Sequence, residues 1–272
     1  MNQSRISIRA ASAGLLIITA AFIPIKTEAL EDYTSPRNAT VDARGARTVT
    51  IEAAAGELRV EGQPGINEVR IRGTARSNRD SRLKDIKLIA ERRGDVIYIK
   101  ADIPDDNNWG SWNGGDRYMA LDLIIEVPIS LRLDVTDGSG DAEFKNTGSL
   151  DFEDGSGNIL VRGAHGDVRI RDGSGNIIIE GVQGAVRVSD GSGEIRANDI
   201  TGNFTVEEDG SGGIDVSGVG GTMRVENDGS GNIDVERVAG DFVVDSDGSG
   251  SIRYATVKGS VRIPERRHRR GY

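Results

Sequence analysis

The stretch DGSGNIIIEGVQGAVRVS, residues 172–189, decides the fold that we expect for this chain. It opens with an Asp-Gly-Ser-Gly turn, and a second turn follows around Gly184. Apolar residues alternate with other residues on either side of that second turn: Ile177, Ile179, Val182, Val186 and Val188. Alternation with a period of two over four to five residues indicates a strand with one buried face. The stretch therefore predicts two short strands joined by two tight turns.

This unit is repeated along the C-terminal half of the chain. Asp-Gly-Ser-Gly occurs seven times, with successive spacings of 17, 18, 18, 19, 19 and 19 residues. The tetrapeptides begin at Asp137, Asp154, Asp172, Asp190, Asp209, Asp228 and Asp247. The five apolar positions recur as well, and in the last unit they are Ile252, Tyr254, Val257, Val261 and Ile263. Self-similarity at a fixed period is typical of repeat architectures.

One such unit cannot bury its own apolar face, whereas stacked units can. The sequence therefore predicts an all-β fold, a two-sheet parallel β-solenoid (β-helix) of seven 17–19-residue coils. Coils are expected to rise by about 4.8 Å, with the two sheets about 10 Å apart. An antiparallel sandwich or barrel is the alternative; it explains the alternation of apolar residues but not the regular period.

The rest of the chain divides around the repeats. Residues 30–47 are polar and are expected to form a flexible lead-in. Residues 48–136 contain alternating segments without a fixed period, which predicts a β-rich N-terminal cap or degenerate first coils. The β-solenoid with the repeats spans residues 137–265, and a basic tail follows over residues 266–272.

Residues 1–29 have the pattern of a signal peptide. Arg5 and Arg9 precede an apolar stretch at residues 13–25, which is shorter than the ~20 residues that span a bilayer. Small residues near Ala29 predict cleavage after it; an uncleaved N-terminal anchor is the alternative. We therefore expect export to the periplasm, the extracellular space or the cell surface, with no transmembrane segment in the mature chain.

Composition excludes several functions. The chain has no cysteine, so disulfides and thiolate chemistry are excluded. Removing residues 1–29 takes away three basic residues and one acidic residue, so the net charge falls from −9 to −11. So acidic a chain is not expected to bind nucleic acid. The mature chain has only two histidines, His165 and His268, which argues against a histidine-based metal site.

The seven repeat aspartates are the candidate metal ligands. Stacked in register, they would stand about 5 Å apart and repel one another. Each carboxylate could instead accept hydrogen bonds from the amides of its own turn. The alternative is a row of Ca²⁺ ions, as in the calcium-binding β-roll, although only one of the two turns carries Asp here.

Two other groups are candidates for interaction with a partner. Trp109 and Trp112 lie in a polar loop between Pro104 and Arg117, where they could bind a sugar or fold back onto the cap. An outward-facing stripe of arginines recurs at one register of the second strand of the unit: Arg169, Arg187, Arg224 and Arg262. The basic tail could contact an anionic envelope surface.

Catalysis is not expected. The serines of the turns form a ladder with no unique member, and none lies in Gly-x-Ser-x-Gly. Parallel β-helices with carboxylate-pair enzyme activity usually carry long insertions between coils, whereas these coils differ by only two residues in length. A polysaccharide-active β-helix enzyme therefore stays the least favoured reading.

Two stretches of the chain resemble a known family. The segment IIEVPISLRLDV runs into DGSGDAEF at residues 124–144, and serial GSGNI units follow. This pattern, over residues 49–263, resembles the bacterial putative-adhesin family, an envelope-associated β-strand-repeat domain of unknown function. The resemblance implies the solenoid fold and an envelope location, with no catalytic residues or cofactor. We therefore expect a non-enzymatic interaction or scaffold module whose partner is an envelope protein or a glycan; a calcium-binding β-roll-like module is the runner-up.

Overall fold

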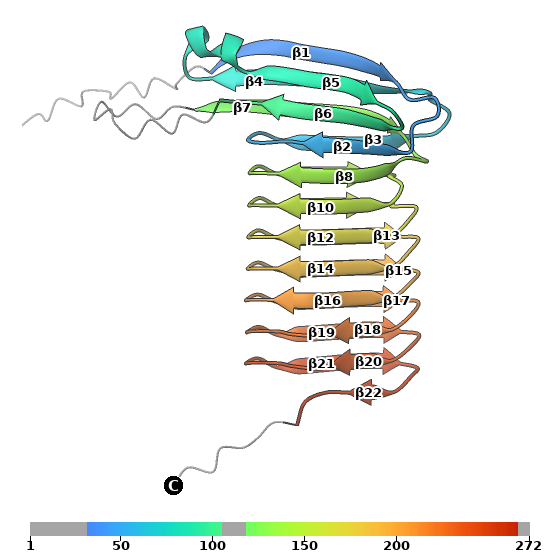
Figure 1. The fold of residues 1–272 in the computed structure, drawn as a ribbon. Helices are drawn as coiled ribbons and strands as arrows, with labels where there is room; N and C mark the ends of the chain where they lie inside the picture. Colours follow the sequence, from blue (N-terminus) through green and yellow to red (C-terminus); the bar gives the residue numbers. More distant parts are fainter. Residues whose placement is uncertain (1–31, 105–117, 266–272) are drawn as a thin grey trace, which may run out of the picture. The chain divides into compact units, whose positions relative to one another are not determined.

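The computed structural model describes residues 32–104 and 118–265 of the 272-residue chain. These residues belong to one compact unit, Asp32–Tyr272. Its strands form two sheets of eleven strands each, which we call sheet A and sheet B (Figure 1). The predicted signal peptide, residues 1–29, lies outside the described residues.

Sheet A contains every second strand of the solenoid and four strands of the N-terminal part. In spatial order its strands are β1 (Tyr33–Asp42), β4 (Glu68–Ser77), β7 (Met119–Pro128), β3 (Leu58–Gln63), β9 (Ala142–Lys145), β11 (Ile159–Arg162), β13 (Ile177–Val182), β15 (Ile195–Ile200), β17 (Ile214–Val219), β19 (Ile233–Val238) and β21 (Ile252–Val257).

Sheet B faces sheet A across the core and is ordered in the same way. Its strands are β5 (Lys87–Arg93), β6 (Val96–Asp102), β2 (Thr48–Glu52), β8 (Arg132–Asp137), β10 (Leu150–Asp154), β12 (Val168–Asp172), β14 (Val186–Asp190), β16 (Phe204–Asp209), β18 (Met223–Val225), β20 (Phe242–Val244) and β22 (Val261–Arg262).

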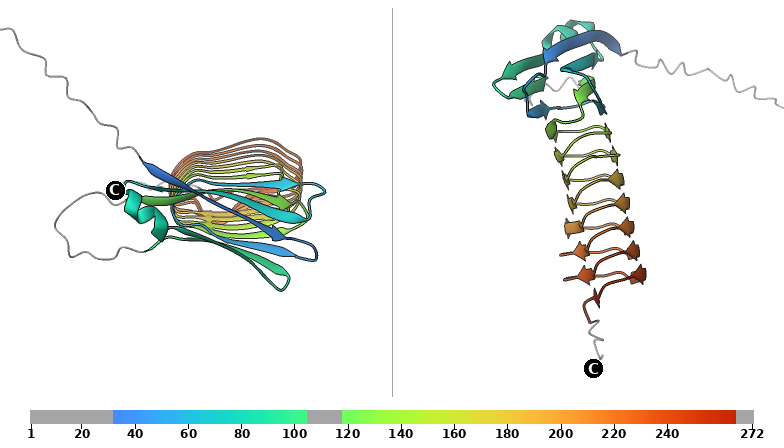
Figure 2. Two further views of the ribbon diagram at one scale, coloured as in Figure 1. Left: turned by 90° about the horizontal axis from the view of Figure 1, so that it is seen from above. Right: turned by 90° about the vertical axis from the view of Figure 1, so that its right-hand side faces the viewer.

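The seven repeats form seven coils, each with one strand in sheet A and one in sheet B (Figure 2). Equivalent residues of successive coils pair in parallel, as Ile159, Ile177 and Ile195 do in sheet A. The predicted two-sheet parallel β-solenoid is therefore confirmed. The alternative of an antiparallel sandwich or barrel is wrong. Each strand of the repeats pairs in parallel with the equivalent strand of the next repeat, as the strands of a regular coil do.

The core lies between the two sheets and consists of apolar ladders. Inward-facing residues of the inner coils, such as Ile177, Ile179 and Val186, are fully buried. Phenylalanines are buried among these ladders, and the rings of Phe144 and Phe152 meet edge to face at 4.8 Å. Each fully buried side chain of this kind contributes roughly 1.5–3 kcal/mol to the stability of the folded chain. These side chains are buried because the coils stack on one another.

Glycine is required where the Asp-Gly-Ser-Gly turns stack. The second glycine of the turn has a positive φ, which is 145° at Gly175. A Cβ atom at Gly175 would also collide with the carbonyl oxygen of Gly157 in the preceding coil. The turns can therefore lie in backbone contact only without side chains at this position.

Residues 48–136 combine parallel coil layers with an antiparallel cover. β3 lies between β7 and β9, and β2 lies between β6 and β8, all in parallel. β4 and β5 then pair antiparallel to β7 and β6. The 3₁₀ helix η1 (Asp80–Asp85) joins β4 to β5 and buries Leu83. An end of the solenoid is thus closed by strands that run against the parallel stack.

The flexible lead-in expected over residues 30–47 is wrong for residues 33–42. These residues form β1, which pairs antiparallel with β4 from Tyr33 to Asp42. Arg37 donates to the carbonyl oxygens of Ile86 (2.9 Å) and Leu83 (2.6 Å), while Ala39 and Val41 pack against the core. The segment was too polar to predict a strand because β1 is an edge strand with one face in solvent, where Pro36 is tolerated.

Helices contribute little to the described residues. None of the helices in residues 32–104 and 118–265 is long and apolar enough to cross a membrane.

Candidate functional site

The repeat aspartates form a continuous ladder inside the solenoid. Five of them, from Asp137 to Asp209, each end a strand of sheet B, whereas Asp228 and Asp247 lie three residues beyond the ends of β18 and β20. Each aspartate is the register partner of the next. Their side chains occupy the third inward-facing position of the strand, after two apolar residues. Asp209 and Asp228 are each only 1% exposed. The carboxyl groups therefore lie in the interior at the turn, and not on the surface.

Turn amides satisfy part of this ladder. The Oδ1 atom of Asp172 accepts from the amide of Ser174 at 3.0 Å, and Asp190 accepts from Ser192 at 3.1 Å. Asp137 and Asp154 each accept one such bond as well. Their Oδ2 atoms are buried and have no hydrogen-bond partner among the described residues. The predicted bonding to the turn amides therefore accounts for only one of the two oxygens at these positions.

Asp209 and Asp228 are less well satisfied. Neither oxygen of either carboxyl has a hydrogen-bond donor among the described residues. The amides of Ser211 and Ser230 lower the pKa of these two carboxyls somewhat, but they lie outside hydrogen-bonding geometry. A buried, unpartnered carboxylate is costly, so this part of the ladder favours the neutral form.

The pKa values of the ladder follow from this environment. Burial, followed by the charge of Asp228, raises the pKa of Asp209 to about 7. Burial and the charge of Asp154 raise the pKa of Asp137 to about 7. The pKa values of Asp154, Asp190 and Asp228 rise to about 6 for the same reasons. A proton on one carboxyl can then be donated to the neighbouring carboxylate, which removes the repulsion between coils.

Metal ligation would need several of these oxygens to converge. Among residues 32–104 and 118–265, no group of three or more His, Asp or Glu side chains is placed to hold a metal ion. Ca²⁺ takes six to eight oxygen ligands. The calcium hypothesis for Asp137, Asp154, Asp172, Asp190, Asp209, Asp228 and Asp247 stays a prediction.

The predicted arginine stripe lies on the outer face of sheet B. Arg169 and Arg187 are register partners, but Thr205 separates them from Arg224, and Val243 separates Arg224 from Arg262.

Acidic neighbours pair with most of the stripe. Glu207 bonds to Arg169 at 3.0 Å and lies 3.6 Å from Arg187, while Arg224 pairs with Asp245. Arg262 has no ion-pair partner among the described residues. This face is therefore a set of solvated ion pairs more than a free cationic surface. Trp109, Trp112 and the basic tail, residues 266–272, lie outside the described residues.

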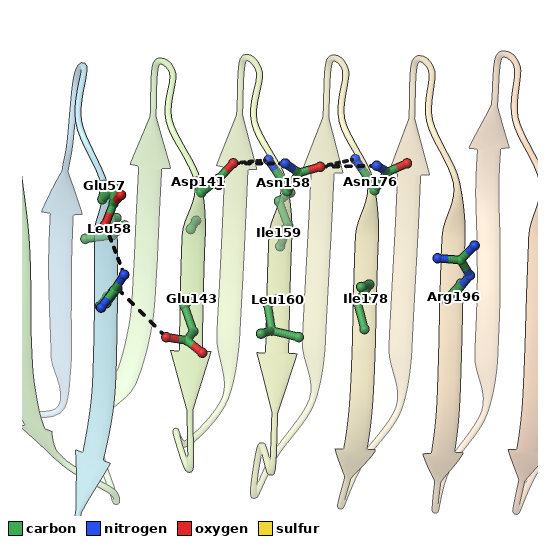
Figure 3. A pocket seen from close by; sticks show the side chains of 12 residues that line it. Glu57, Leu58, Asp141, Glu143, Asn158, Ile159, Leu160, Asn176, Ile178 and Arg196 are labelled. Carbon is green, nitrogen blue, oxygen red and sulfur yellow. Dashed lines mark hydrogen bonds and ion pairs between the residues drawn. The ribbon is translucent and has the colours of Figure 1, made fainter. Parts of the chain in front are cut away.

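A shallow groove on the outer face of sheet A was not predicted. Its volume is about 400 Å³, and it crosses β3, β9, β11, β13 and β15 (Figure 3). Leu160 and Ile178, which are register partners on β11 and β13, lie at its centre and are half-buried. In the next three coils the same register holds Arg196, Asp215 and Asp234, so these two coils alone of the five carry an apolar residue here.

Polar side chains border the groove on two sides. Asn158 donates its backbone amide and its Nδ2 to Asp141 at 3.0 and 3.1 Å. Asn176 bonds to Asn158 in the same way at 3.3 and 3.2 Å, which makes a ladder along one border. At the ends lie Arg196, which bonds to Glu194 at 2.5 Å, and Arg59, which bonds to Glu57 at 3.1 Å. Figure 3 shows the ladder of Asp141, Asn158 and Asn176 beside the two apolar side chains, with Arg196 on the next strand.

The sequence contains a signal for this groove. The units NILVRG and NIIIEG place an apolar residue at an outward position where later units place Arg or Asp. A comparison of the repeats by outward position, and not only by inward position, would have found Leu160 and Ile178. We missed them because an isolated outward apolar residue is common and needs no explanation.

The fold and these surfaces define a class of protein, the two-sheet parallel β-solenoid with a covered N-terminal end. Several solved structures are similar to the chain. A protein from Bacteroides fragilis described as a putative adhesin is 14% identical, with 85% of this chain and 96% of that chain covered and a TM-score of 0.44. A putative lipid binding protein from Parabacteroides distasonis is 15% identical, with 85% and 97% covered and a TM-score of 0.48.

A third solved structure is described as a putative cell adhesion protein from Clostridium sporogenes. It is 12% identical, with 85% of this chain and 99% of that chain covered and a TM-score of 0.34. No protein-family model and no curated protein matches the chain. Solved structures described as putative adhesins are among those similar to the chain.

Proposed function

We propose that this chain is a non-enzymatic, exported cell-envelope protein that binds a partner protein through the groove on sheet A. The groove has an apolar centre, Leu160 and Ile178, and a rim of amides and paired charges. An apolar centre with a polar rim is the usual anatomy of a protein interface. The pair is the observation that carries the proposal, because the same register is charged in the following coils.

A protein partner fits the groove better than a glycan does. Sugars are bound preferentially by stacking on aromatic side chains, and none of the residues that line the groove is aromatic. The outer amides of the Asn158 and Asn176 ladder already bond to each other and to Asp141. The apolar side chains of Leu160 and Ile178 remain available for binding, and they suit an aliphatic or aromatic side chain of a partner protein.

The carboxylates of the groove support a non-enzymatic role. Glu57 is bonded to Arg59, Asp141 accepts from Asn158, and Glu143 bonds to Lys145 at 2.7 Å. A carboxyl that acts as a general acid is usually held away from cations so that it stays protonated. Glu57 and Glu143 instead pair with cations and Asp141 bonds to an amide, so the polysaccharide-active enzyme reading gains no support from them.

Site-specific photocrosslinking tests the proposal. A photoreactive residue placed at Leu160 should crosslink to one defined protein in the native envelope, and Ile178→Asp in the same chain should remove that product. A photoreactive residue at Thr205, on the outer face of sheet B, is the matched control and should give no such product. Crosslinking of equal strength from both faces, or none from Leu160, contradicts the proposal. Retention of the chain by a purified envelope glycan, lost in Ile178→Asp, would replace the protein partner with a glycan.

Export can be tested separately. The pattern of residues 1–29 supports cleavage after Ala29, so the mature protein should begin at Leu30. Intact-mass measurement of protein from the periplasm or the culture medium reads this directly. A mass that retains residues 1–29 in the membrane fraction would support the uncleaved anchor instead.

A calcium-binding module is the second candidate, and the buried carboxylate oxygens without donors favour it. A ligand that binds only the folded state raises the melting temperature by mass action. If Ca²⁺ occupies the ladder, millimolar calcium should raise the melting temperature strongly over excess EDTA, and Asp209→Asn should reduce the rise. If protons alone compensate the ladder, calcium should leave the melting temperature unchanged at every pH.

A further inference from the structure

The last coil leaves one end of the solenoid open. β21 and β22 are the terminal strands of sheet A and sheet B, so their outer backbone groups pair with no strand of the described residues. Tyr254 is 48% exposed, Val261 is 37% exposed and Ile263 is 38% exposed. Their counterparts one coil earlier, such as Val235 and Phe242, are at most 1% exposed. The open end is therefore a cross-section of the core, which we call the end face (Tyr254, Val261, Ile263).

The opposite end of the stack is built differently. There β1, β4, β5 and η1 cover the last parallel layer, and the edge strand β1 carries Pro36 and Arg37. Proline and charged side chains on an edge strand prevent it from pairing with another chain. The end face is less protected: β21 contains no proline, its charged residue Arg253 is paired with Asp234 on the preceding coil, and its inward residues Ile252, Tyr254 and Val257 are apolar or aromatic. Residues 266–272 include four arginines, which do not supply the apolar alternation of a further coil.

We propose that the end face binds the end face of a second copy of this chain, which gives a two-fold symmetric dimer. Stacking of apolar cross-sections already joins the successive coils inside this molecule, and the end face presents one more such cross-section, with Tyr254 in the place of Val235. A second copy presents a matching cross-section with two unpaired edges. The covered end cannot take part, so the contact closes at two copies and does not propagate into a fibre.

Register selects the geometry of this pairing. The parallel strands of two copies related by a two-fold axis meet antiparallel, and directly opposite residues point to the same face. The two-fold axis must pass through a residue of β21. If it passed between two residues, inward-facing side chains of one copy would lie opposite outward-facing side chains of the other. An axis at Arg253 would put two arginines face to face, whereas an axis at Tyr254 stacks two tyrosine rings and puts Arg253 opposite Ala255.

Sheet B is compatible with the same axis. The rings of Tyr254 and Phe242 have centroids 5.8 Å apart, and Val261 is the register partner of Phe242. An axis through Tyr254 perpendicular to the sheets therefore passes close to Val261. With Val261 opposite itself, Arg262 falls opposite Ser260, so like charges are not brought together in this sheet either.

The size of the end face sets the strength of the contact. A strand of six residues is about 20 Å long, and the two sheets lie about 10 Å apart. When the thickness of the two sheets is added, the end face is roughly 20 Å wide, so each copy can bury an area of roughly 400 Å². That is roughly half of what a standard interface buries on each partner. The dimer should therefore depend on concentration and should be seen in the micromolar to millimolar range, as expected of a protein crowded at a surface.

The chain lacks cysteine, which allows a sharp test. Tyr254→Cys should form a symmetric disulfide-linked dimer under mild oxidation, because opposite Cβ atoms lie about 4.5–5.5 Å apart in an antiparallel pair. Ile124→Cys is the matched control: Ile124 is 42% exposed on the outer face of sheet A and should give no rapid crosslink. Sedimentation of the unmodified chain over increasing concentration should show a monomer–dimer equilibrium.

Two further variants separate the end face from folding. Tyr254→Glu and Val261→Lys should abolish the dimer by burying unpaired charge, while circular dichroism and the melting temperature stay near those of the parent. Ile124→Glu should leave the dimer intact. A chain that is monomeric at all concentrations, or that crosslinks equally from residues 124 and 254, overturns the proposal. So does a chain that stays monomeric while Tyr254→Glu removes binding of a different protein, because the end face would then belong to that partner.

Discussion

Asp209 and Asp228 lie one coil apart in the interior, and each is 1% exposed. Burial and the neighbouring carboxyls raise their pKa values to about 7 and about 6, from a model-compound value of 3.8. The folded protein therefore binds protons at pH 5 that the unfolded chain does not bind. Folding is favoured by these groups below pH 3.8, and this contribution is lost as the pH rises through 6 to 7.

The first prediction is that stability falls toward alkaline pH. The free energy of unfolding, measured by urea titration, should be lower at about pH 8 than at about pH 5. Over this range, one carboxyl whose pKa moves from 3.8 to about 6 accounts for on the order of 1.4 kcal/mol at most, because only about one pKa unit of its shift lies above pH 5.

The substitution Asp209→Asn tests whether the aspartate ladder causes this dependence on pH. Asp209→Asn keeps the shape, is neutral, and can donate to an unpartnered carboxylate oxygen of Asp228. It should raise the stability at pH 8 and flatten the dependence on pH. Asp215→Asn, on the outer face of β17, should change neither. A free energy of unfolding that rises from pH 5 to pH 8 would contradict a protonated ladder.

The stacked turn makes a second prediction at the scale of one residue. Gly175 has a positive φ and faces the carbonyl oxygen of Gly157, whereas Gly65 has a positive φ (75°) and open space around it. Gly175→Ala should therefore lower the free energy of unfolding by at least about 2 kcal/mol more than Gly65→Ala does. Equal losses, measured by urea titration, would mean that the turns of adjacent coils do not lie in backbone contact.

At the scale of elements, Arg37 connects the edge strand β1 to the rest of the cover at the N-terminal end of the stack. Arg37 donates to two carbonyl oxygens, those of Leu83 and Ile86, which lie at the end of η1 and just after it. These bonds connect the edge strand to the segment that joins β4 to β5. The cover is therefore held by hydrogen bonds from a charged group as well as by the partly buried Ala39 and Val41.

The third prediction concerns this cover. Arg37→Ala should cost about 1.5–3 kcal/mol of stability, because two carbonyl oxygens lose a charged donor. Arg44→Ala is the control; Arg44 is exposed and pairs with Asp42 at 2.8 Å, so its loss should cost less than about 1 kcal/mol. Hydrogen exchange should show faster opening of β1 in Arg37→Ala only. Equal exchange in the two variants would contradict a role for Arg37 in closing the end.

On the scale of the whole molecule, the solenoid is a sum of like coils. Each coil contacts only its neighbours, so stability should follow from the number of coils and of the interfaces between them. The spacing of 19 residues between Asp190 and Asp209 defines one complete coil.

The fourth prediction is that the chain tolerates loss of one whole coil. Deleting residues 190–208 brings Asp209 to the place of Asp190 and keeps every later strand in its sheet. The shortened chain should fold, unfold cooperatively, and show a smaller urea m-value because it exposes less surface on unfolding. Deleting residues 190–198 should instead prevent folding of the later coils, since it moves their strands to the wrong sheet. If both deletions behaved alike, the coil would not be the unit of stability.

Sequence alone determined the repeat, its length, the two strands of each unit and the inward residues, because a constant period and alternation of apolar residues leave few other ways to bury them. The tertiary structure was needed to decide three things that depend on neighbours distant in sequence. It showed β1 as an edge strand held by Arg37, the repeat aspartates as interior and partly unpartnered, and Leu160 beside Ile178 at a register that is charged in the later coils. Each of these features depends on contacts with a segment that lies one coil away or across a sheet. A local sequence pattern does not show which distant segment that is.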